Sequence, residues 1–353
     1  MSGSSKYSVL KDDPRIKKIL EGGSVHDDLV TAAYADSTWN KILSSLNAYE
    51  SFCKEENVNI RFPITEDDMG RFINWAIFKK QMSPNSLTAY ISNLKLIHKL
   101  RKLPTPGCDS LLCKTQVRGA KNLKYYESDS KTVKKTMTLP LLRLLGDALS
   151  KNNWSVHSKL VVWTTYTVAF MGSFRMGELL ARSKFAFNVF ETLLWSDIKF
   201  IGVNSVQIHN KIPKNRNPNG EYISLFPFPL HGCCPIAALL KLKESSNVTG
   251  RENSPVFMFN NGACLTKARL NRLIVEQLTP HLGIEAKNYS SKSFRSALPS
   301  ALASHPKMQN DSTIKRWGRW NSNAFERYTR LSHKAKEKLF AKFALALENS
   351  LHD

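Results

Sequence analysis

The chain has 353 residues, with 51 Lys and Arg against 29 Asp and Glu, which gives a formal net charge of +22. A chain of this length is too long to fold around one ordinary hydrophobic core, so we expect two domains. The positive charge is spread along the whole sequence, which predicts a polyanionic partner. Because 42% of the residues are hydrophobic, the composition excludes a disordered basic tail. The sequence contains no apolar run as long as a membrane span or a signal peptide, so we expect an intracellular protein with no membrane contact.

The first part of the chain is predicted to be an arm followed by a helical domain. Residues 1–25 are polar and lack a stable hydrophobic period, so we expect a mobile arm there. From residue 26 to residue 120, apolar residues spaced three and four apart predict amphipathic helices that pack as a small all-helical domain. Three helix starts carry cap signals: Ser37 or Thr38, Thr65 with Asp68 in a capping box, and Ser83 followed by Pro84.

A basic segment separates this domain from the rest of the chain. The sequence KTQVRGAKNLKYYESDSKTVKK is rich in lysine and poor in aliphatic residues, and we place a linker at 121–136. Such a segment suits contact with a phosphate backbone, and an ordinary solvated loop is the alternative interpretation. The predicted phosphate contacts are Lys121, Lys124, Lys131, Lys134 and Lys135, together with Arg316 farther along the chain.

The second domain is predicted to span residues 137–353 and to be mainly α-helical with a small antiparallel β-sheet. The helix LVVWTTYTVAFMGSF is apolar on all sides, so we expect it at the centre. Strand-like pieces follow, LLWSDIKF, SVQIHNK and YISLF, and Asn219-Gly220 before the last piece predicts a hairpin. Helices are predicted from there to the end. The last of them, KAKEKLFAKFALALEN, either docks on a neighbouring subunit or closes its own core.

The six cysteines form no CxxC pair and no spacing with histidine that would build a zinc site. We therefore interpret them as reduced, mostly structural thiols, and we expect no bound metal. They are Cys53, Cys108, Cys113, Cys233, Cys234 and Cys264.

Four pieces of the second domain place cations or a tyrosine at the edges of helices or of the hairpin: SFRMGELL, HNKIPKNR, SKSFRSAL and GRWNSNAFERY. Each piece alone is typical of a solvated surface or an ordinary helical ion pair. Their order resembles the catalytic domain of the tyrosine recombinases, the DNA strand-transfer enzymes that include phage integrases, over roughly residues 137–345. LLWSDIKF and PVFMFNNGACLT also resemble this family. GRW followed by AF-x-RY most resembles the recombinases of eukaryotic Crypton and DIRS or Ngaro mobile elements.

The resemblance implies a fold and an activity. A helical core-binding domain of SAM-like fold and a catalytic domain would form a C-shaped clamp on double-stranded DNA. A site-specific recombinase or transposase of this kind cleaves and rejoins DNA through a 3′-phosphotyrosine intermediate. Because that intermediate keeps the bond energy, the reaction needs no ATP, metal or other cofactor. One tyrosine cuts one strand, so exchange between two duplexes needs four active sites. We therefore expect self-assembly from dimer to tetramer on DNA, in the nucleus or wherever the host DNA lies.

Carried over residue by residue, the resemblance makes Tyr328 the nucleophile. Arg175 and Arg295 would hold the scissile phosphate and stabilise its transition state, because a guanidinium offers a planar fork of donors and keeps its charge at any working pH. Glu178, three residues after Arg175, corresponds to the acidic residue that often supports the site. Since a phenol has a reference pKa of about 10, nearby cations must favour the phenolate of the tyrosine.

Alternatives remain at the other catalytic positions. Lys211 or Lys214 of the hairpin would protonate the leaving 5′ oxygen, and we favour Lys211 because it directly follows the strand SVQIH. Trp320 takes the family's His or Trp position and would donate its indole N–H, with Arg319 as a competitor on spacing. Lys292 stands where the family most often has histidine, three residues before the second arginine. A lysine can still donate to the phosphate, but it is a poor general base unless burial lowers its pKa.

Three alternatives compete with an active recombinase. A domesticated relative would bind DNA without cutting it, with Lys292 as a symptom of decay. A type IB topoisomerase would use the same chemistry to relax DNA, and a generic basic protein would bind DNA without catalytic ancestry. Retention of the tyrosine, both arginines and a hairpin lysine favours activity, and the separate helical first domain favours a recombinase over a topoisomerase. Base-reading contacts are expected on helices of both domains, and the candidates in the first are Ser86, Thr88, Asn93 and Lys95.

Overall fold

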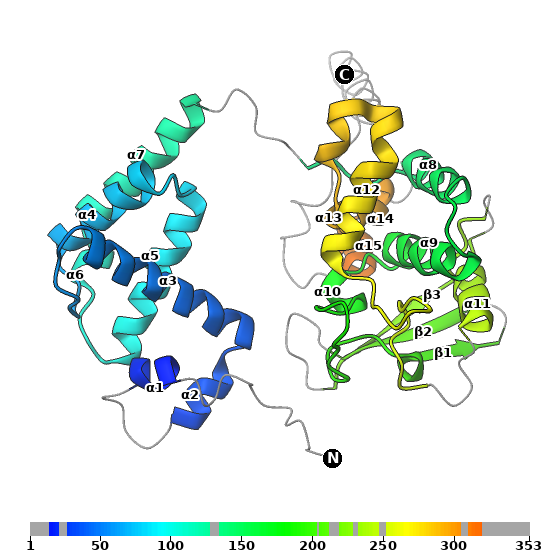
Figure 1. The fold of residues 1–353 in the computed structure, drawn as a ribbon, viewed down its shortest axis with the longest axis horizontal. Helices are drawn as coiled ribbons and strands as arrows, with labels where there is room; N and C mark the ends of the chain where they lie inside the picture. The colour runs from blue at the N-terminus through cyan, green and yellow to red at the C-terminus, as the bar shows by residue number, and fades with distance from the viewer. Residues whose placement is uncertain are drawn as a thin grey trace, which may run out of the picture. The chain divides into compact units, whose positions relative to one another are not determined.

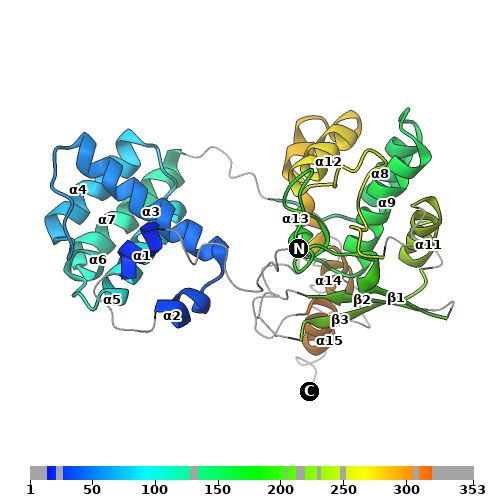
Figure 2. The same cartoon turned by 60° about the horizontal axis from the view of Figure 1, so that its bottom comes forward.

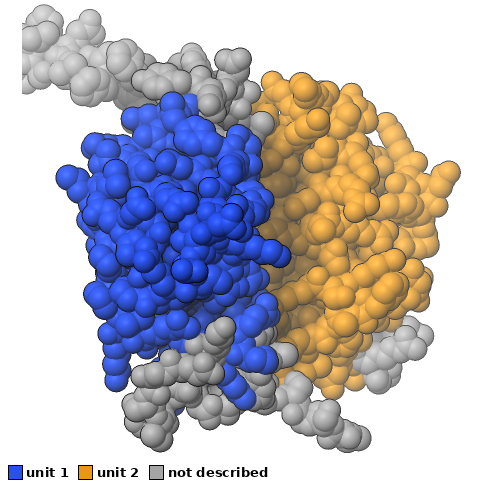
Figure 3. All heavy atoms as spheres, turned by 60° about the vertical axis from the view of Figure 1, so that its left-hand side comes forward, with its two compact units in different colours: residues 1–131 blue, residues 132–353 orange. Residues whose placement is uncertain are grey.

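The chain is divided into two compact units, residues 1–131 and residues 132–353 (Figures 1 and 3). The structure, a computed structural model, describes residues 14–20, 27–127, 134–202, 205–211, 219–228, 232–246, 252–304 and 310–319. Unit 1 is helical, and unit 2 combines helices with one antiparallel sheet of three strands. The predicted fold class, mainly α with a small antiparallel sheet in the second part, is confirmed.

Unit 1 is built from helices whose starts follow local cap chemistry. The hydroxyl of Thr65 accepts a hydrogen bond from the backbone N–H of Asp68, and Ser83 does the same for Ser86. These two predicted caps are confirmed. The elements are α1 (Pro14–Leu20), α2 (Asp27–Ala33), α3 (Asp36–Glu55), α4 (Glu66–Asn74), the π-helical η1 (Trp75–Lys79), α5 (Pro84–Leu100), α6 (Pro106–Asp109) and α7 (Leu111–Glu127).

Three boundaries in unit 1 differ from the sequence prediction. Helix α3 begins at Asp36, behind Ala35 and without a side-chain cap, so the predicted cap at Ser37 or Thr38 was wrong. Residues 14–20 of the predicted arm form α1, because Ile16 and Ile19 are buried in the core of the unit. Helix α7 continues to Glu127, so the beginning of the predicted linker at 121–136 is helical.

The apolar helix α9 is the central helix of unit 2, and it lies between α12 and the sheet in both ribbon views (Figures 1 and 2). Most of its side chains are buried, as its all-round apolar sequence predicts. The elements are α8 (Leu139–Ser150), α9 (Val156–Met171), α10 (Met176–Leu179), the 3-10 helix η2 (Trp195–Asp197), β1 (Ile198–Ile201), β2 (Ser205–Asn210), β3 (Glu221–Leu225), α11 (Pro235–Ser245), α12 (Lys267–Leu282), the 3-10 helix η3 (Gly283–Asn288), α13 (Ser291–Arg295), α14 (Ala297–Ala303) and α15 (Asp311–Gly318).

The sheet has the order β1-β2-β3 and is antiparallel throughout. Strands β2 and β3 pair as the sequence predicts, with His209 opposite Tyr222 and Asn210 opposite Glu221. Gly220 precedes β3 with φ of +68°, and a Cβ atom there would lie 2.6 Å from the carbonyl oxygen of Asn210. This position therefore requires glycine, which fixes the register at the end of the sheet where the functional side chains gather. Within the described residues, no helix combines the length and apolarity that a membrane crossing requires.

Candidate functional site

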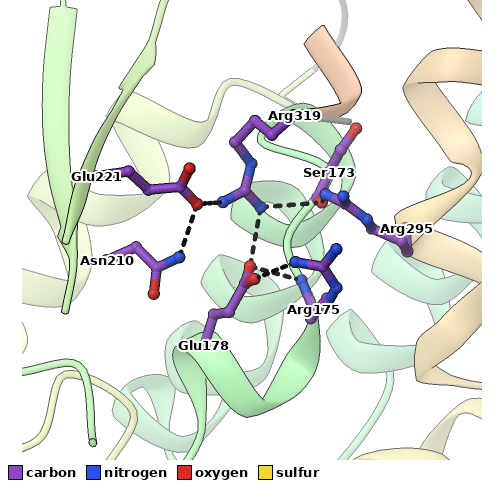
Figure 4. Close-up of polar contacts among 7 residues, drawn as sticks. All are labelled: Ser173, Arg175, Glu178, Asn210, Glu221, Arg295 and Arg319. Atoms are coloured by element: carbon purple, nitrogen blue, oxygen red, sulfur yellow. Dashed lines mark hydrogen bonds and ion pairs between the residues drawn. The ribbon is translucent and has the colours of Figure 1, made fainter. Parts of the chain in front are cut away.

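Arginines from three separate places in unit 2 meet around the first turn of α10 (Figure 4). Arg175 directly precedes α10, and its backbone N–H donates to Oε2 of Glu178 over 2.9 Å. The same arginine donates from Nη1 to Oε1 of Glu178 over 2.8 Å. Arg319 donates from Nη2 to Oε2 of Glu178, also over 2.8 Å. One carboxylate therefore orients two guanidinium groups.

Arg319 makes further contacts that join the sheet to the helices. It follows α15 in the left-handed conformation, with φ of 56°, and its Nη1 donates to Oε1 of Glu221 on β3 over 2.5 Å. Asn210, opposite Glu221 in the sheet, donates to the same oxygen over 2.8 Å. The guanidinium also lies 4.9 Å from the ring centroid of Phe174. These contacts hold Arg319 in one orientation beside α10.

Arg295 reaches the same place from α13. It is only 4% exposed, and its Nη1 donates to the backbone carbonyl of Ser173, which also accepts from Nη2 of Arg319 over 3.2 Å. The neighbouring Phe294 stacks on Tyr166 of α9 with the two rings 7° from parallel. This stack anchors α13 against the central helix and so positions the arginine.

We call Arg175, Arg295 and Arg319 the guanidinium cluster. Among the residues drawn in Figure 4, its three positive charges face two negative ones, the carboxylates of Glu178 and Glu221, which leaves an excess of one positive charge. Burial alone would raise the pKa of Glu178, whose side chain is 5% exposed. The charge and hydrogen bond of Arg319, with the hydrogen bonds from Arg175, outweigh burial and hold that pKa below its ordinary value. Glu178 is therefore ionised at neutral pH. A cluster of this kind can bind a tetrahedral oxyanion and stabilise charge that develops on it.

The preferred hairpin lysine lies at the end of β2. The ammonium of Lys211 donates to Oδ2 of Asp197 over 2.5 Å and to the carbonyl of Val189 over 2.7 Å. Asp197 in turn accepts the backbone N–H of Leu194 over 2.8 Å. The side chain of Lys211 is 19% exposed, and it is held by the end of η2 and by the loop before that helix. The alternative, Lys214, lies outside the described residues.

Lys292 occupies the exposed face of the short helix α13. Within the part of the chain that the structure describes, no contact joins its ammonium to the guanidinium cluster. The predicted nucleophile Tyr328 and the predicted Trp320 lie outside the described residues. So does the C-terminal segment, which was predicted either to dock on a neighbouring subunit or to close its own core.

The predicted phosphate contacts have different surroundings. Lys121 is exposed on α7, and Arg316 is exposed on α15. Lys134 donates to the carbonyl of Lys287 over 2.7 Å, and Lys135 forms an ion pair with Glu285, so both are engaged by η3. Lys131 lies outside the described residues, and the side chain of Lys124 is not described either.

The predicted base-reading residues make contacts inside unit 1. The amide of Asn93 donates to the hydroxyl of Ser45 over 2.9 Å, which ties α5 to α3. Lys95 forms an ion pair with Asp109. Thr88 donates to the carbonyl of Pro84 within its own helix. The polar face of α5 that was predicted to read bases therefore partly serves packing inside unit 1.

Three members of the site were missed by sequence reasoning: Ser173, Asn210 and Glu221. Asn210 and Glu221 come together only through the register of β2 and β3, which the sequence does not specify to the residue. Ser173 contributes a backbone carbonyl, and its one sequence signal is its place between Gly172 and the arginine motif. A Cβ atom at Gly172 would lie 2.2 Å from the ring of Phe174, so this tight turn needs glycine.

The described residues contain no group of three or more His, Cys, Asp or Glu side chains suited to a metal ion. All six cysteines are free, and five of them are buried.

Comparison with known proteins gives a match in structure. No protein-family model matches the chain, and no curated protein matches it in sequence. Among solved structures, the XerH site-specific recombinase bound to palindromic difH substrate is 12% identical with a TM-score of 0.57, over 94% of this chain and 84% of that chain. The Tn1549 transposon integrase in complex with transposon right end DNA is 13% identical with a TM-score of 0.57, over 93% and 97%. A lambda integrase tetramer bound to a Holliday junction is 14% identical with a TM-score of 0.55, over 90% and 76%. The chain therefore has the fold of the tyrosine recombinases, as its sequence predicts.

Proposed function

We propose that this chain cleaves and rejoins double-stranded DNA as a tyrosine recombinase, with Tyr328 as the nucleophile. The observation that carries the proposal is the meeting of three arginines on a recombinase fold. Arg175 and Arg319 share the ionised carboxylate of Glu178. Arg295 joins Arg319 at the backbone carbonyl of Ser173. Guanidinium groups held from separate elements form a rigid set of donors for one phosphate. A surface that only attracted DNA would not need them oriented by a buried carboxylate and a backbone carbonyl.

The chemistry follows from what these groups can do. The scissile phosphodiester would sit on the guanidinium cluster, which stabilises the charge of the pentavalent transition state. The phenolic oxygen of Tyr328 would attack phosphorus and form the 3′-phosphotyrosine bond while the bond to the 5′ oxygen breaks. Lys211 would supply the proton that the leaving 5′ oxygen needs, with Lys214 as the alternative. Rejoining is the reverse reaction with a 5′ hydroxyl as nucleophile, so neither ATP nor a metal ion takes part.

Arg319, rather than Trp320, is our proposed third phosphate ligand. The sequence left the two residues as competitors. The contacts of Arg319 with Glu178 and with the carbonyl of Ser173 support it, because they place a guanidinium directly beside the other two. Trp320 would then pack next to the phosphate as an indole donor. Lys292 would assist only if it turns toward the phosphate when DNA binds.

The wider setting is part of the same proposal. The units would grip DNA as a C-shaped clamp, and two duplexes would be exchanged in a tetramer of four chains. This assembly is suggested by the lambda integrase tetramer on a Holliday junction. A recombinase or transposase of a mobile element acting in the nucleus is the context we favour. The second candidate is a domesticated relative that binds DNA without cutting it, and Lys292 in place of histidine is the observation that favours it.

The test begins with the DNA that the protein prefers. Random duplexes are selected by binding to the full chain, and the enriched sequence is rebuilt as suicide substrates with a nick at successive positions, so that the short 5′-hydroxyl fragment diffuses away. We expect a covalent adduct on a denaturing gel at one nick position, and none with Tyr328→Phe. Specific binding with no adduct from the wild-type chain, but an adduct from Lys292→His, would establish the domesticated alternative. No adduct from either protein on bound DNA would overturn the proposal.

A further inference from the structure

A hollow of about 310 Å³ lies beside the guanidinium cluster, between the edge strand β3 and helix α15. Its lining includes Tyr222 and Ile223 from the strand and Arg316, Trp317 and Arg319 from the helix and its end. The volume is at the lower end of the roughly 300–1,000 Å³ that small ligand sites occupy. Because Arg319 lines the hollow and also belongs to the cluster, one guanidinium connects the two.

Aromatic rings at this hollow are exposed rather than packed away. Tyr222 is 68% exposed and Trp317 is 43% exposed. Phe226, the residue directly after β3, is exposed as well. Large aromatic side chains usually lose most of their surface to a core, and a group of exposed rings marks a binding surface. These rings are therefore available to a ligand.

The rings are also held in place by neighbours. Tyr222 stacks on His209, its partner across the sheet, with ring centroids 4.7 Å apart and planes 16° from parallel. The ring of Trp317 meets that of Phe226 edge to face, with centroids 6.4 Å apart. One side of each ring is thus occupied by protein. Binding to the remaining surface costs little side-chain entropy, because the rings are already ordered.

The charge around the rings selects an anionic partner. Arg316 is exposed at the hollow, and the guanidinium cluster carries an excess positive charge next to it. Flat rings interleaved with arginines are the chemistry that binds single-stranded nucleic acid, where bases stack and phosphates pair with cations. In a paired duplex the faces of the bases are covered by their neighbours, so only an unpaired base could use these rings.

We propose that this hollow binds one unpaired nucleobase of the DNA strand whose phosphate sits on the guanidinium cluster. The base stacks on Tyr222 or Trp317, and Arg316 contacts a flanking phosphate. The inference rests on the proposed function for the position of the phosphate. It adds to that function a preference for DNA that is unpaired next to the cleavage point.

The test uses the selected duplex in three forms: fully paired, with one extra unpaired 2-aminopurine at successive positions, and with an abasic spacer at the same positions. Affinity is measured by fluorescence anisotropy at one salt concentration, and stacking is measured by quenching of the 2-aminopurine. We expect one position at which the unpaired base binds about tenfold more tightly than either the paired or the abasic form, since stacking of a base on an aromatic side chain is worth roughly 5- to 150-fold.

The variants separate stacking from charge. At least one of Tyr222→Ala and Trp317→Ala, the variant that removes the stacking ring, should abolish the preference for the unpaired base. Both should leave affinity for the paired duplex unchanged. Trp317→Phe, which keeps an aromatic face, should retain most of the preference. Arg316→Ala should weaken all three DNA forms alike. The matched control is Phe185→Ala, an exposed phenylalanine outside the hollow in the same unit, and it should change none of these affinities.

Three outcomes would overturn the inference. One is equal affinity for the paired, unpaired and abasic forms. Another is a preference that survives both Tyr222→Ala and Trp317→Ala. The third is a change of oligomeric state in the alanine variants, which would show that the hollow holds a segment of a second copy of the chain. Failure here is distinct from failure of the proposed function, because the Tyr328-dependent adduct is measured on fully paired nicked DNA.

Discussion

Glu178 is buried beneath Arg175 and Arg319, and its carboxylate accepts hydrogen bonds from both. Without that charge, guanidinium groups brought together by three separate elements would repel one another in a poorly solvated place. With it, they stay oriented before any substrate arrives. A phosphate that binds there meets donors that need no rearrangement, which is the arrangement that lowers the barrier of a charged transition state.

Glu178→Gln should therefore destabilise the protein while favouring anion binding. We expect the free energy of unfolding at pH 7 to fall by about 3 kcal/mol, the usual cost of breaking a buried ion pair. Sulfate or inorganic phosphate should restore more stability in the variant than in the wild-type chain, because an anion can replace the missing charge. Thermal unfolding followed by circular dichroism, with and without sulfate, measures both effects.

The pH dependence of the difference in stability between the wild-type chain and Glu178→Gln is the control for this prediction. Because the pKa of Glu178 is lowered in the folded chain, its stabilisation is complete above the ordinary carboxyl pKa of about 4.3 and is lost as the pH falls through the folded-state value. The wild-type and variant proteins should therefore converge in stability in acid. Equal stability of the two proteins at pH 7 would show that Glu178 does not hold the cluster together.

Arg319→Gly tests the role of the third guanidinium with little disturbance of the backbone. Arg319 has φ of 56°, a conformation that glycine adopts without strain, so the variant removes the side chain and keeps the helix end. We expect adduct formation in single turnover to slow by about 10²- to 10³-fold, the loss seen when one transition-state donor is removed. Trp320→Phe is the paired comparison. A large loss in Trp320→Phe together with a small one in Arg319→Gly would reverse our assignment.

At the scale of elements, the β2–β3 pair brings two groups of side chains to one end of the sheet, where Asn210 pairs with Glu221. Glu221 and Asn210 hold Arg319, and the next residue after β2, Lys211, is the candidate general acid. In this structure its ammonium is bound by Asp197 and the carbonyl of Val189. In the proposed reaction, Lys211 would leave these partners before it protonates the leaving group. The strand end would then have a resting arrangement, the one in this structure, and a catalytic one.

A leaving group that needs no proton distinguishes Lys211 from Lys214. A suicide substrate with sulfur in place of the bridging 5′ oxygen releases a thiolate, which departs without a proton donor because, with a thiol pKa of about 8.5, it is a much weaker base than an alkoxide. We expect Lys211→Ala to slow cleavage of the ordinary substrate by about 10²- to 10⁴-fold and to cleave the sulfur substrate at close to the wild-type rate. Lys214→Ala should affect the two substrates alike. Rescue of Lys214→Ala instead would move the role to that residue.

Local chemistry decided which elements the sequence could predict. The caps at Thr65 and Ser83 depend on residues three positions apart, and both predictions are correct. The start of α3 and the existence of α1 depend on tertiary burial, which no local signal reports. At the site, Arg175, Glu178 and Arg295 were found through a motif, and they do converge. Glu221 could not be found, because its contact with Arg319 joins positions brought together only by the fold.

At the scale of the whole molecule, the net charge of +22 would contribute to the proposed DNA binding through those cations that are exposed and not already paired. Lys121 is exposed on α7, whereas Lys134 and Lys135 are already engaged by η3 of unit 2. A lysine that neutralises a DNA phosphate releases condensed counterions, whereas one already paired with a carboxylate releases fewer. The predicted basic linker is thus not uniform: its helical beginning is better placed to contact phosphate than its end.

The salt dependence of binding tests this difference. We expect Lys121→Ala to reduce the slope of log affinity against log salt by about 0.9, the contribution of one phosphate contact, and to weaken binding to selected and random duplexes by the same factor. Lys135→Ala should change the slope less, because its ammonium pairs with Glu285. The control is Lys199→Ala, exposed on β1 at the edge of the sheet away from β3 and Arg319. If Lys199→Ala lowers the slope as much as Lys121→Ala, the attraction comes from the overall positive charge of the protein, and Lys121 on α7 makes no specific contact with a DNA phosphate.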